Sequence, residues 1–330
     1  MRSGGKQVSR RLVLGCAVLA VQLVIALPAH AGVTIPGITG ATGVTGQKSA
    51  ATLPTPRPSW YTAKLNRRVL AAGYRGVQVR LSKKQAALDP DCLGYAPPST
   101  SPPGLKAVAA GTCMVAPFGC TMNFIFTDGT SNYIGTAGHC VAKGGAVVAQ
   151  VATRIDPTDS VVVTLAAIGR TVKKMNNGIG QDFGLVKIDP GWPVVPGIAG
   201  AAGPTGTFCG DPVGQPVIHY GHGYIFLVEQ GVPKAGEVIP DLNAVVPFKS
   251  TQYGYNWVGY GLPGDSGSPV MNAAGLATGD LTHGLAIAGV PIPGLNFGTD
   301  MAGIFNFLGA GYSLVTADGR KVNCSGLVGV

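Results

Sequence analysis

The sequence predicts an all-β fold, a sandwich or a pair of small antiparallel barrels, for the chain beyond residue 105. Short runs rich in β-branched and aromatic residues recur there, at 122–127, 146–151, 160–166 and 225–229. Gly, Pro, Asn and Asp separate these runs, and 51 of the 330 residues are glycine, which suits tight turns and barrel corners. Long stretches with helical spacing are scarce beyond residue 105, so two small barrels side by side fit the length best.

The first 31 residues have the pattern of a secretory signal peptide. Four basic residues and no acid precede residue 12, and an almost wholly apolar run covers residues 12–27. The run is short for a membrane span, which needs about 20 residues, and it closes on an Ala-x-Ala pattern at residues 29–31. We therefore expect cleavage near Ala31 and a secreted protein without a stable membrane anchor. An uncleaved N-terminal anchor is the alternative.

Cysteine usage agrees with export. Beyond Cys16 in the signal segment, an even six cysteines remain, which suits an oxidising compartment. Three disulfides are expected, with fifteen possible pairings, among Cys92, Cys113, Cys120, Cys140, Cys209 and Cys324.

Residues 32–105 form a basic segment that differs from the rest of the chain. Its net charge is +7, whereas the chain from residue 106 onward carries −2. Residues 32–55 contain few large apolar groups and are expected to form a flexible lead. Four prolines between residues 97 and 103 favour an extended linker.

A short helix is expected within this basic segment. Residues 60–72 have roughly helical apolar spacing, Ser59 can cap the first turn, and Gly73 can end the helix. Beyond the linker, a separate folded domain is expected to cover residues 106–330.

Three strings carry candidate catalytic side chains, and the first presents an imidazole. His139 follows a strand-like run that ends in small residues, and histidine suits proton transfer because its unperturbed pKa is about 6.5. Cys140 follows directly, and Cys120 lies twenty residues earlier. A disulfide between these cysteines could hold the strands beneath the imidazole.

The other two strings present a carboxylate and a hydroxyl. Asp182 begins a strand-like run, where its side chain can bond the far N–H of an imidazole and fix the tautomer. Alone, an Asp there would more often be a turn residue. Small residues flank Ser266, and the N–H groups of Gly264 and Ser266 can converge on the oxyanion of a tetrahedral intermediate. An ordinary Gly-Ser turn is the alternative.

Taken together, these strings resemble those of the chymotrypsin-like, or trypsin-like, serine proteases of secreted bacterial type. They are Thr-Ala-Gly-His-Cys at 136–140, Asp-Phe-Gly-Leu-Val at 182–186 and Gly-Asp-Ser-Gly-Ser-Pro-Val at 264–270. The resemblance covers about residues 106–330 and implies two antiparallel six-stranded barrels with a catalytic triad in the cleft between them.

By this resemblance the protein hydrolyses peptide bonds in protein or peptide substrates without a cofactor or a metal. Ser266 would attack the scissile carbonyl, His139 would act as general base and then general acid, and Asp182 would orient His139. The pair Cys120–Cys140 matches the disulfide of the family. The pairing of the other four cysteines stays open, with Cys92–Cys209 as a guess.

Two features depart from the family pattern. No Ile-Val-Gly-Gly-like string precedes the expected catalytic domain, so Asp265 needs a different partner. Tyr260 stands six residues before Ser266, where an acid would favour basic substrates, so Arg or Lys specificity is not expected. Tyr260 and His283 are candidate substrate-pocket residues. His283 could bind an acidic side chain, or it could be an ordinary buried histidine.

Other classes of protein fit less well. His219 and His222 lack the third ligand and the helix of a zinc hydrolase. The lipase pattern Gly-x-Ser-x-Gly fails because Ser268 stands in place of the last glycine. The main alternative is an inactive protease homologue that serves as a secreted or envelope-associated binding module.

The remaining expectations concern partners. No aromatic and basic platform suggests nucleic-acid binding, and a monomer is expected. The charge difference suggests that residues 32–105 are a pro-region docked on the catalytic domain, with a linker or a solvated tail as the alternative.

Overall fold

The structure is a computed structural model, and it describes residues 58–82, 84–85, 107–155, 160–198, 202–223, 232–240, 252–287 and 290–326. All of them belong to one compact unit, Ser49–Val330. The predictions for the signal segment, the lead, the proline-rich linker and the strand at 225–229 lie outside the described residues.

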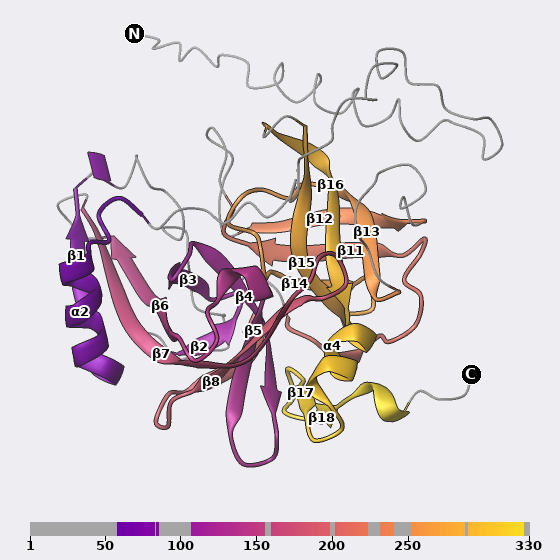
Figure 1. The fold of residues 1–330 in the computed structure, drawn as a ribbon, viewed down its shortest axis with the longest axis horizontal. Helices are drawn as coiled ribbons and strands as arrows, with labels where there is room; N and C mark the ends of the chain where they lie inside the picture. The colour runs from indigo at the N-terminus through magenta and orange to yellow at the C-terminus, as the bar shows by residue number, and fades with distance from the viewer. Residues whose placement is uncertain are drawn as a thin grey trace, which may run out of the picture. The chain divides into compact units, whose positions relative to one another are not determined.

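Six antiparallel strands close the first barrel, drawn in purple to pink in Figure 1. In order around the barrel they are β3 (Cys113–Ala116), β4 (Cys120–Thr127), β5 (Asn132–Thr136), β8 (Asp182–Ile188), β7 (Val161–Asn176) and β6 (Ala146–Ile155). The strands predicted at 122–127, 146–151 and 160–166 are confirmed. Every residue of β4 is buried, because Met122 packs in one apolar cluster and Phe124 in another. This two-sided burial explains its largely apolar sequence.

Six further antiparallel strands close the second barrel, drawn in orange in Figure 1. They are β11 (Pro216–Gly221), β12 (Val232–Ile239), β13 (Gly254–Gly259), β16 (Val290–Asp300), β15 (Leu276–Ile287) and β14 (Pro269–Asn272). The rings of Tyr255 and Trp257 stack in its core with centroids 5.2 Å apart. Two closed six-stranded barrels make this the chymotrypsin-like double-barrel fold, as the resemblance implied.

Short strands complete the sheets. Parallel pairs join β2 (Val108–Ala110) to β9 (Val194–Ile198) and β10 (Gly206–Thr207) to β15. Antiparallel pairs join β17 (Ser313–Val315) to β4 and to β18 (Lys321–Val322).

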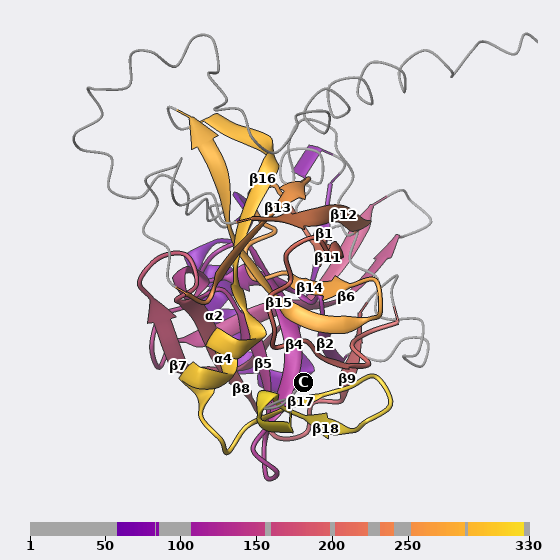
Figure 2. The ribbon, with the colours of Figure 1, turned by 90° about the vertical axis from the view of Figure 1, so that its right-hand side faces the viewer.

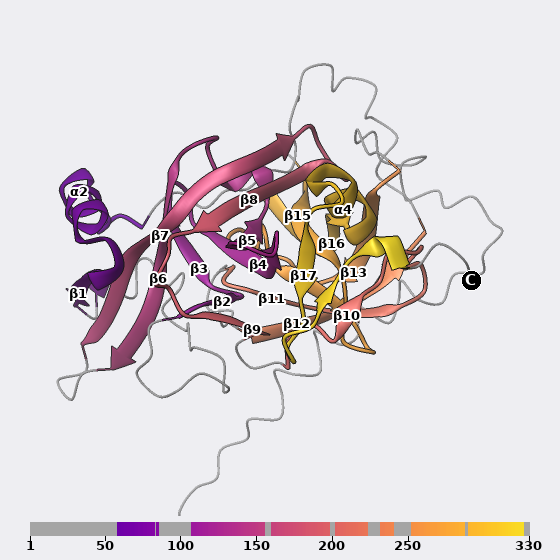
Figure 3. The ribbon, with the colours of Figure 1, turned by 90° about the horizontal axis from the view of Figure 1, so that it is seen from below.

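Hydrogen bonds and apolar packing join the two barrels where the candidate residues lie. Thr121 N donates to Ser266 O over 2.9 Å, and Asp182 N donates to Thr299 Oγ1 over 3.3 Å. The helix α4 (Met301–Leu308) follows β16 and packs its apolar side chains against those of β8. Figures 2 and 3 show α4 beside β8. Asp182 and Ser266 are therefore held by contacts that cross between barrels.

The helix predicted near residue 60 is present as α2 (Ala63–Ala72), and Gly73 ends it as predicted. The predicted cap at Ser59 is wrong. Thr62 caps the helix by accepting a hydrogen bond from Leu65 N over 3.1 Å, because a backbone turn precedes the helix and delays its start.

After α2, a short 3₁₀ turn leads into β1 (Val77–Leu81), which adds to the edge of β7. Figure 3 shows α2 and β1 along the outside of the first barrel. A buried apolar cluster joins the two parts, and it contains Trp60, Leu65, Val69, Leu81, Val115, Val148, Val163 and Leu165. The described part of the basic segment thus docks through apolar packing and strand pairing, with the basic side chains of α2 exposed on its other face.

The disulfide Cys120–Cys140 is confirmed. The guess of Cys92–Cys209 is wrong, because Cys209 pairs with Cys324 across 115 residues of sequence. Cys113 is also disulfide-bonded. Among the described residues, no helix is both long enough and apolar enough to cross a membrane.

Candidate active site

His139 and Asp182 form a buried hydrogen-bonded pair. His139 lies on the short 3₁₀ turn Gly138–Cys140 after β5, and Asp182 is the first residue of β8. The Asp182 carboxylate accepts hydrogen bonds from His139 Nδ1 over 2.6 Å and from the His139 backbone N–H over 2.8 Å. The turn can approach this closely because residue 138 is glycine: a Cβ there would lie 1.8 Å from Met175 O.

The surroundings of Asp182 determine its charge state. Burial would raise the pKa of Asp182, but the charge and hydrogen bonds of His139 lower it below the usual value. Asp182 is therefore a carboxylate at neutral pH and favours the His139 tautomer with the proton on Nδ1. His139 Nε2 is then a proton acceptor, and it has no hydrogen-bond partner among the described residues.

Ser266 lies on the turn that precedes β14. Its Oγ donates to Thr282 O over 3.4 Å, so this structure does not join the Ser266 hydroxyl to His139. Catalytic hydrogen bonds of free enzymes are often long or misaligned and form only with substrate bound. The structure thus brings His139 and Asp182 together, while the expected link from His139 to Ser266 is not formed.

The backbone around Ser266 leaves two donors unused. Within the described part of the chain, the N–H groups of Gly264 and Ser266 donate to no acceptor. The N–H groups of Asp265, Gly267 and Ser268 donate to the carbonyls of Leu262, Leu281 and Asp265. Gly264 has a φ of 97°, which disfavours any residue with a Cβ. Thr121 Oγ1 donates to Gly264 O over 2.9 Å and supports this backbone. Two unused N–H groups beside a serine are what an oxyanion hole requires.

Lys234 neutralises Asp265, the residue before Ser266. Lys234 Nζ lies 2.9 Å from Asp265 Oδ1, and both side chains are almost wholly buried. Gly223 N and Leu262 N donate to the same carboxylate over 2.7 and 2.9 Å. Burial would raise the pKa of Asp265, but Lys234, His219 and the Gly223 N–H hold it below the usual value. Lys234 could not be recognised from the sequence, because one lysine within a strand carries no signal of its partner.

The two candidate pocket residues lie in different surroundings. Tyr260 is half exposed, and its carbonyl accepts a hydrogen bond from His219 Nε2 over 2.5 Å. His283 is buried beside the His139–Asp182 pair, with Nδ1 2.8 Å from Thr282 Oγ1 and 3.8 Å from Asp182 Oδ2. Burial lowers the pKa of His283 to about 4, although the charge of Asp182 opposes this shift. The imidazole is therefore neutral near pH 7 and offers hydrogen bonds rather than a positive charge.

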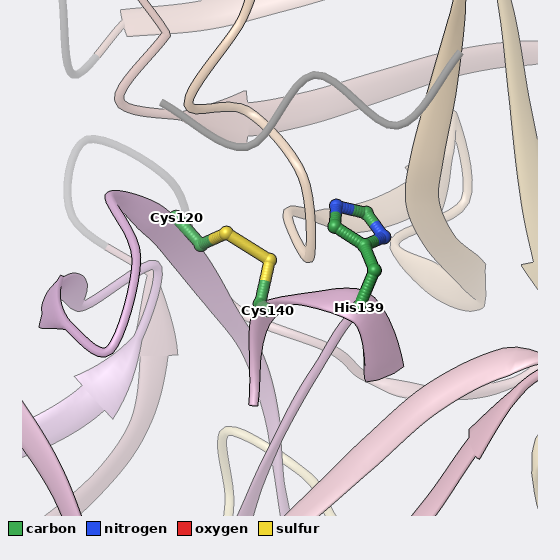
Figure 4. Close-up of side chains that lie close together, drawn as sticks. All are labelled: Cys120, His139 and Cys140. Atoms are coloured by element: carbon green, nitrogen blue, oxygen red, sulfur yellow. A yellow bond between two sulfur atoms is a disulfide. The ribbon is translucent and has the colours of Figure 1, made fainter. Parts of the chain in front are cut away.

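The disulfide Cys120–Cys140 lies beside His139. Figure 4 shows the His139 imidazole beside the disulfide, with one ring nitrogen on the side of the sulfur atoms. The ligand atoms of these three residues lie close enough together to hold a metal ion. The two sulfurs are bonded to each other, however, so neither can offer a thiolate. The disulfide therefore supports the turn that carries His139.

His219 and His222 also do not form a shared ligand set. His219 Nε2 donates to Tyr260 O, and His222 Nε2 bonds Gly111 O over 2.6 Å. Burial lowers the pKa of both imidazoles to about 4. Both rings are neutral near pH 7, and each uses its Nε2 proton in a different contact.

No family model matches the sequence, and no curated protein is significantly similar to it. Among solved structures, the chain is similar to protease A of Thermobifida fusca, with 18% identity, a TM-score of 0.45, and coverage of 64% of this chain and 99% of that one. It is also similar to a chymotrypsin of Cellulomonas bogoriensis, with 18% identity, a TM-score of 0.43, and coverage of 64% and 98%. Likenesses this distant leave the chemistry of the chain to be argued from its own residues.

Proposed function

We propose that the protein is a secreted serine endopeptidase that cleaves protein or peptide substrates through Ser266, His139 and Asp182. The observation that carries this proposal is the buried His139–Asp182 pair with an unused Nε2, at the junction between barrels that also holds the Ser266 turn. The two unused N–H groups of Gly264 and Ser266 support it independently, because they suit the oxyanion of acyl transfer.

In the proposed reaction, His139 Nε2 removes the Ser266 proton as Oγ attacks the scissile carbonyl carbon. The N–H groups of Gly264 and Ser266 stabilise the oxyanion, and Asp182 stabilises the imidazolium. His139 then protonates the leaving amine, which releases the first peptide and leaves an acyl-enzyme. Water attacks this ester by the same route and releases the second peptide.

Export and processing belong to the same proposal. The disulfides suit an extracellular protein. The packing of α2 and β1 on the first barrel favours a mature protein that keeps residues 58–82. Mass spectrometry of the secreted protein tests both points: a mature N-terminus that still contains residues 1–31 contradicts export by cleavage near Ala31. One that begins beyond Leu81 in active enzyme contradicts retention of α2 and β1.

A fluorophosphonate probe tests the proposed nucleophile directly. The probe should label the purified secreted protein, and casein should be digested, while Ser266→Ala should lose both. Ser325→Ala is a matched control, because Ser325 is exposed and, among the described residues, forms hydrogen bonds to Asn323 alone. If the folded protein is not labelled and does not digest casein, the proposal fails. The alternative of an inactive protease homologue that serves as a binding module then takes its place.

A further inference from the structure

A surface cleft of about 660 Å³ lies beside the turn that joins β7 to β8. The end of β7, this turn and helix α4 form its walls, and Figure 3 shows the end of β7 close to α4. None of its lining residues is His139, Asp182 or Ser266. Its volume lies within the usual range for ligand sites, about 300–1,000 Å³. The cleft therefore contains none of the candidate catalytic side chains and is large enough to hold a ligand.

The charge of the cleft is positive. Lys143 and Lys174 line it, and no acidic side chain of the described residues does so. Lys174 Nζ donates to Val141 O over 2.6 Å, which leaves two of its three ammonium protons for a ligand. Lys143 is exposed. Asp182 follows the turn directly, but its carboxylate is buried and bonded to His139, so it does not face the cleft. The ligand should therefore carry negative charge.

Amide side chains provide most of the remaining polar groups. Asn176, Asn177, Gln181 and Asn306 line the cleft, and none of these side chains makes a hydrogen bond with another described residue. An amide offers both donors and acceptors, as needed for the N–H and C=O groups of a peptide backbone. Tyr253 and Phe307 add apolar surface for side chains.

We propose that this cleft is an exosite that binds an acidic segment of a polypeptide substrate, away from the bond that is cleaved. The proposal rests on the proposed peptidase function. The lysines would pair with carboxylates, the amides with the peptide backbone, and Tyr253 and Phe307 with apolar side chains. A nucleic acid or another long polyanion fits less well, because such ligands are bound through many cationic contacts and this cleft has two.

Binding can be measured without catalysis. Full-length Ser266→Ala protein would be titrated into a fluorescent peptide of alternating Glu and Ala, with a Gln and Ala peptide for comparison, at low and high salt. We expect the acidic peptide to bind more tightly than the neutral one and to lose affinity as salt rises. Adding Lys143→Glu and Asn306→Asp should weaken binding about tenfold or more, because both place negative charge in the cleft. Both side chains are exposed, so the fold should tolerate both substitutions.

Lys321→Glu with Asn132→Asp is the matched control, because it makes the same charge change at exposed positions outside the cleft. Equal binding losses in the control and the cleft variant would overturn the exosite, and so would equal binding of the two peptides. If a sulfated or phosphorylated polymer bound more tightly than the acidic peptide, the proposal that the ligand is a polypeptide would be overturned. Since the protein lacks Ser266, failure of the peptidase function leaves this result intact.

A second measurement links the cleft to catalysis. In the active protein, kcat/KM would be compared between one substrate extended by an acidic tail and the same substrate extended by a neutral tail. We expect the acidic tail to raise kcat/KM mainly through a lower KM, and the cleft variant to remove this preference. A preference that survives in the cleft variant would place acidic recognition elsewhere on the protein.

Discussion

Lys234 Nζ lies 2.9 Å from Asp265 Oδ1, and this buried ion pair holds the turn that carries Ser266. Lys234→Met should leave Asp265 buried without its counterion and reduce the free energy of unfolding by about 3–5 kcal/mol. Because the turn would shift, kcat/KM should fall by about 10²-fold or more. Urea unfolding and peptide cleavage would measure the two effects. Lys321→Met, at an exposed lysine, is the control. An unchanged kcat/KM would show that the ion pair does not position Ser266.

Asp182→Asn should lower kcat by about 10⁴-fold while the fold stays intact, because the amide favours the wrong tautomer of His139. Circular dichroism would establish the fold, and a peptide substrate would report kcat. Asp189→Asn changes an exposed aspartate close by in sequence and should have little effect. A loss of less than tenfold in Asp182→Asn would contradict the role of Asp182.

Asp280 is a fully buried carboxyl group whose Oδ1 accepts a hydrogen bond from Thr299 N over 3.2 Å. Burial, together with the charge of Asp182, raises the pKa of Asp280 well above its usual value. Because the pKa of Asp280 is higher in the folded than in the unfolded state, its contribution to stability is fully present below the unfolded pKa of about 3.9. This contribution is lost as pH rises toward the folded pKa.

Asp280→Asn should therefore become more stable relative to the parent as pH rises from 4 to 8, because asparagine does not ionise. Urea unfolding of both proteins at pH 4, 6 and 8 measures the difference. A difference that is constant across this range would mean that Asp280 has an ordinary pKa.

Three buried histidines should stay neutral well below their usual pKa. Burial lowers the pKa of His219, His222 and His283 to about 4. Their contribution to stability is present above the unfolded pKa of about 6.5 and is lost as pH falls toward 4, at roughly 1.4 kcal/mol per pH unit for each. NMR titration of the Ser266→Ala protein, assigned with single His→Gln variants, should show no protonation of these three rings above pH 5.5. Titration of any of them near 6.5 would contradict its burial.

The packing of α2 on the first barrel should contribute to stability. Val69 is fully buried in the cluster that joins them, so Val69→Ala should lower the free energy of unfolding by about 2 kcal/mol. Leu70→Ala, at a position that is 41% exposed, should cost less than about 0.5 kcal/mol. A chain that begins at Lys106 should lose more than either variant, because it exposes the apolar barrel surface under α2. Equal melting temperatures for this chain and the full-length protein would show that α2 and β1 are dispensable.

Much of the double barrel and of the candidate site could be predicted from local sequence. The alternation of apolar runs with Gly and Pro predicted β4, β6 and β7, because strands and turns depend on neighbouring residues. The short strings around His139, Asp182 and Ser266 could be recognised for the same reason. The end of the helix at Gly73 was also predictable. Its first residue was not, because a backbone turn precedes the helix and Thr62 rather than Ser59 is the N-cap.

The sequence by itself thus determined the all-β class and the candidate catalytic residues, and the family resemblance added the disulfide Cys120–Cys140. Only the tertiary structure decided that Cys209 pairs with Cys324, that Lys234 neutralises Asp265, and that α2 packs on the first barrel. These contacts join residues that are far apart in the chain, and no local periodicity specifies them. They arise when two closed barrels bring distant strands together and burial requires each charge and each apolar face to find a partner.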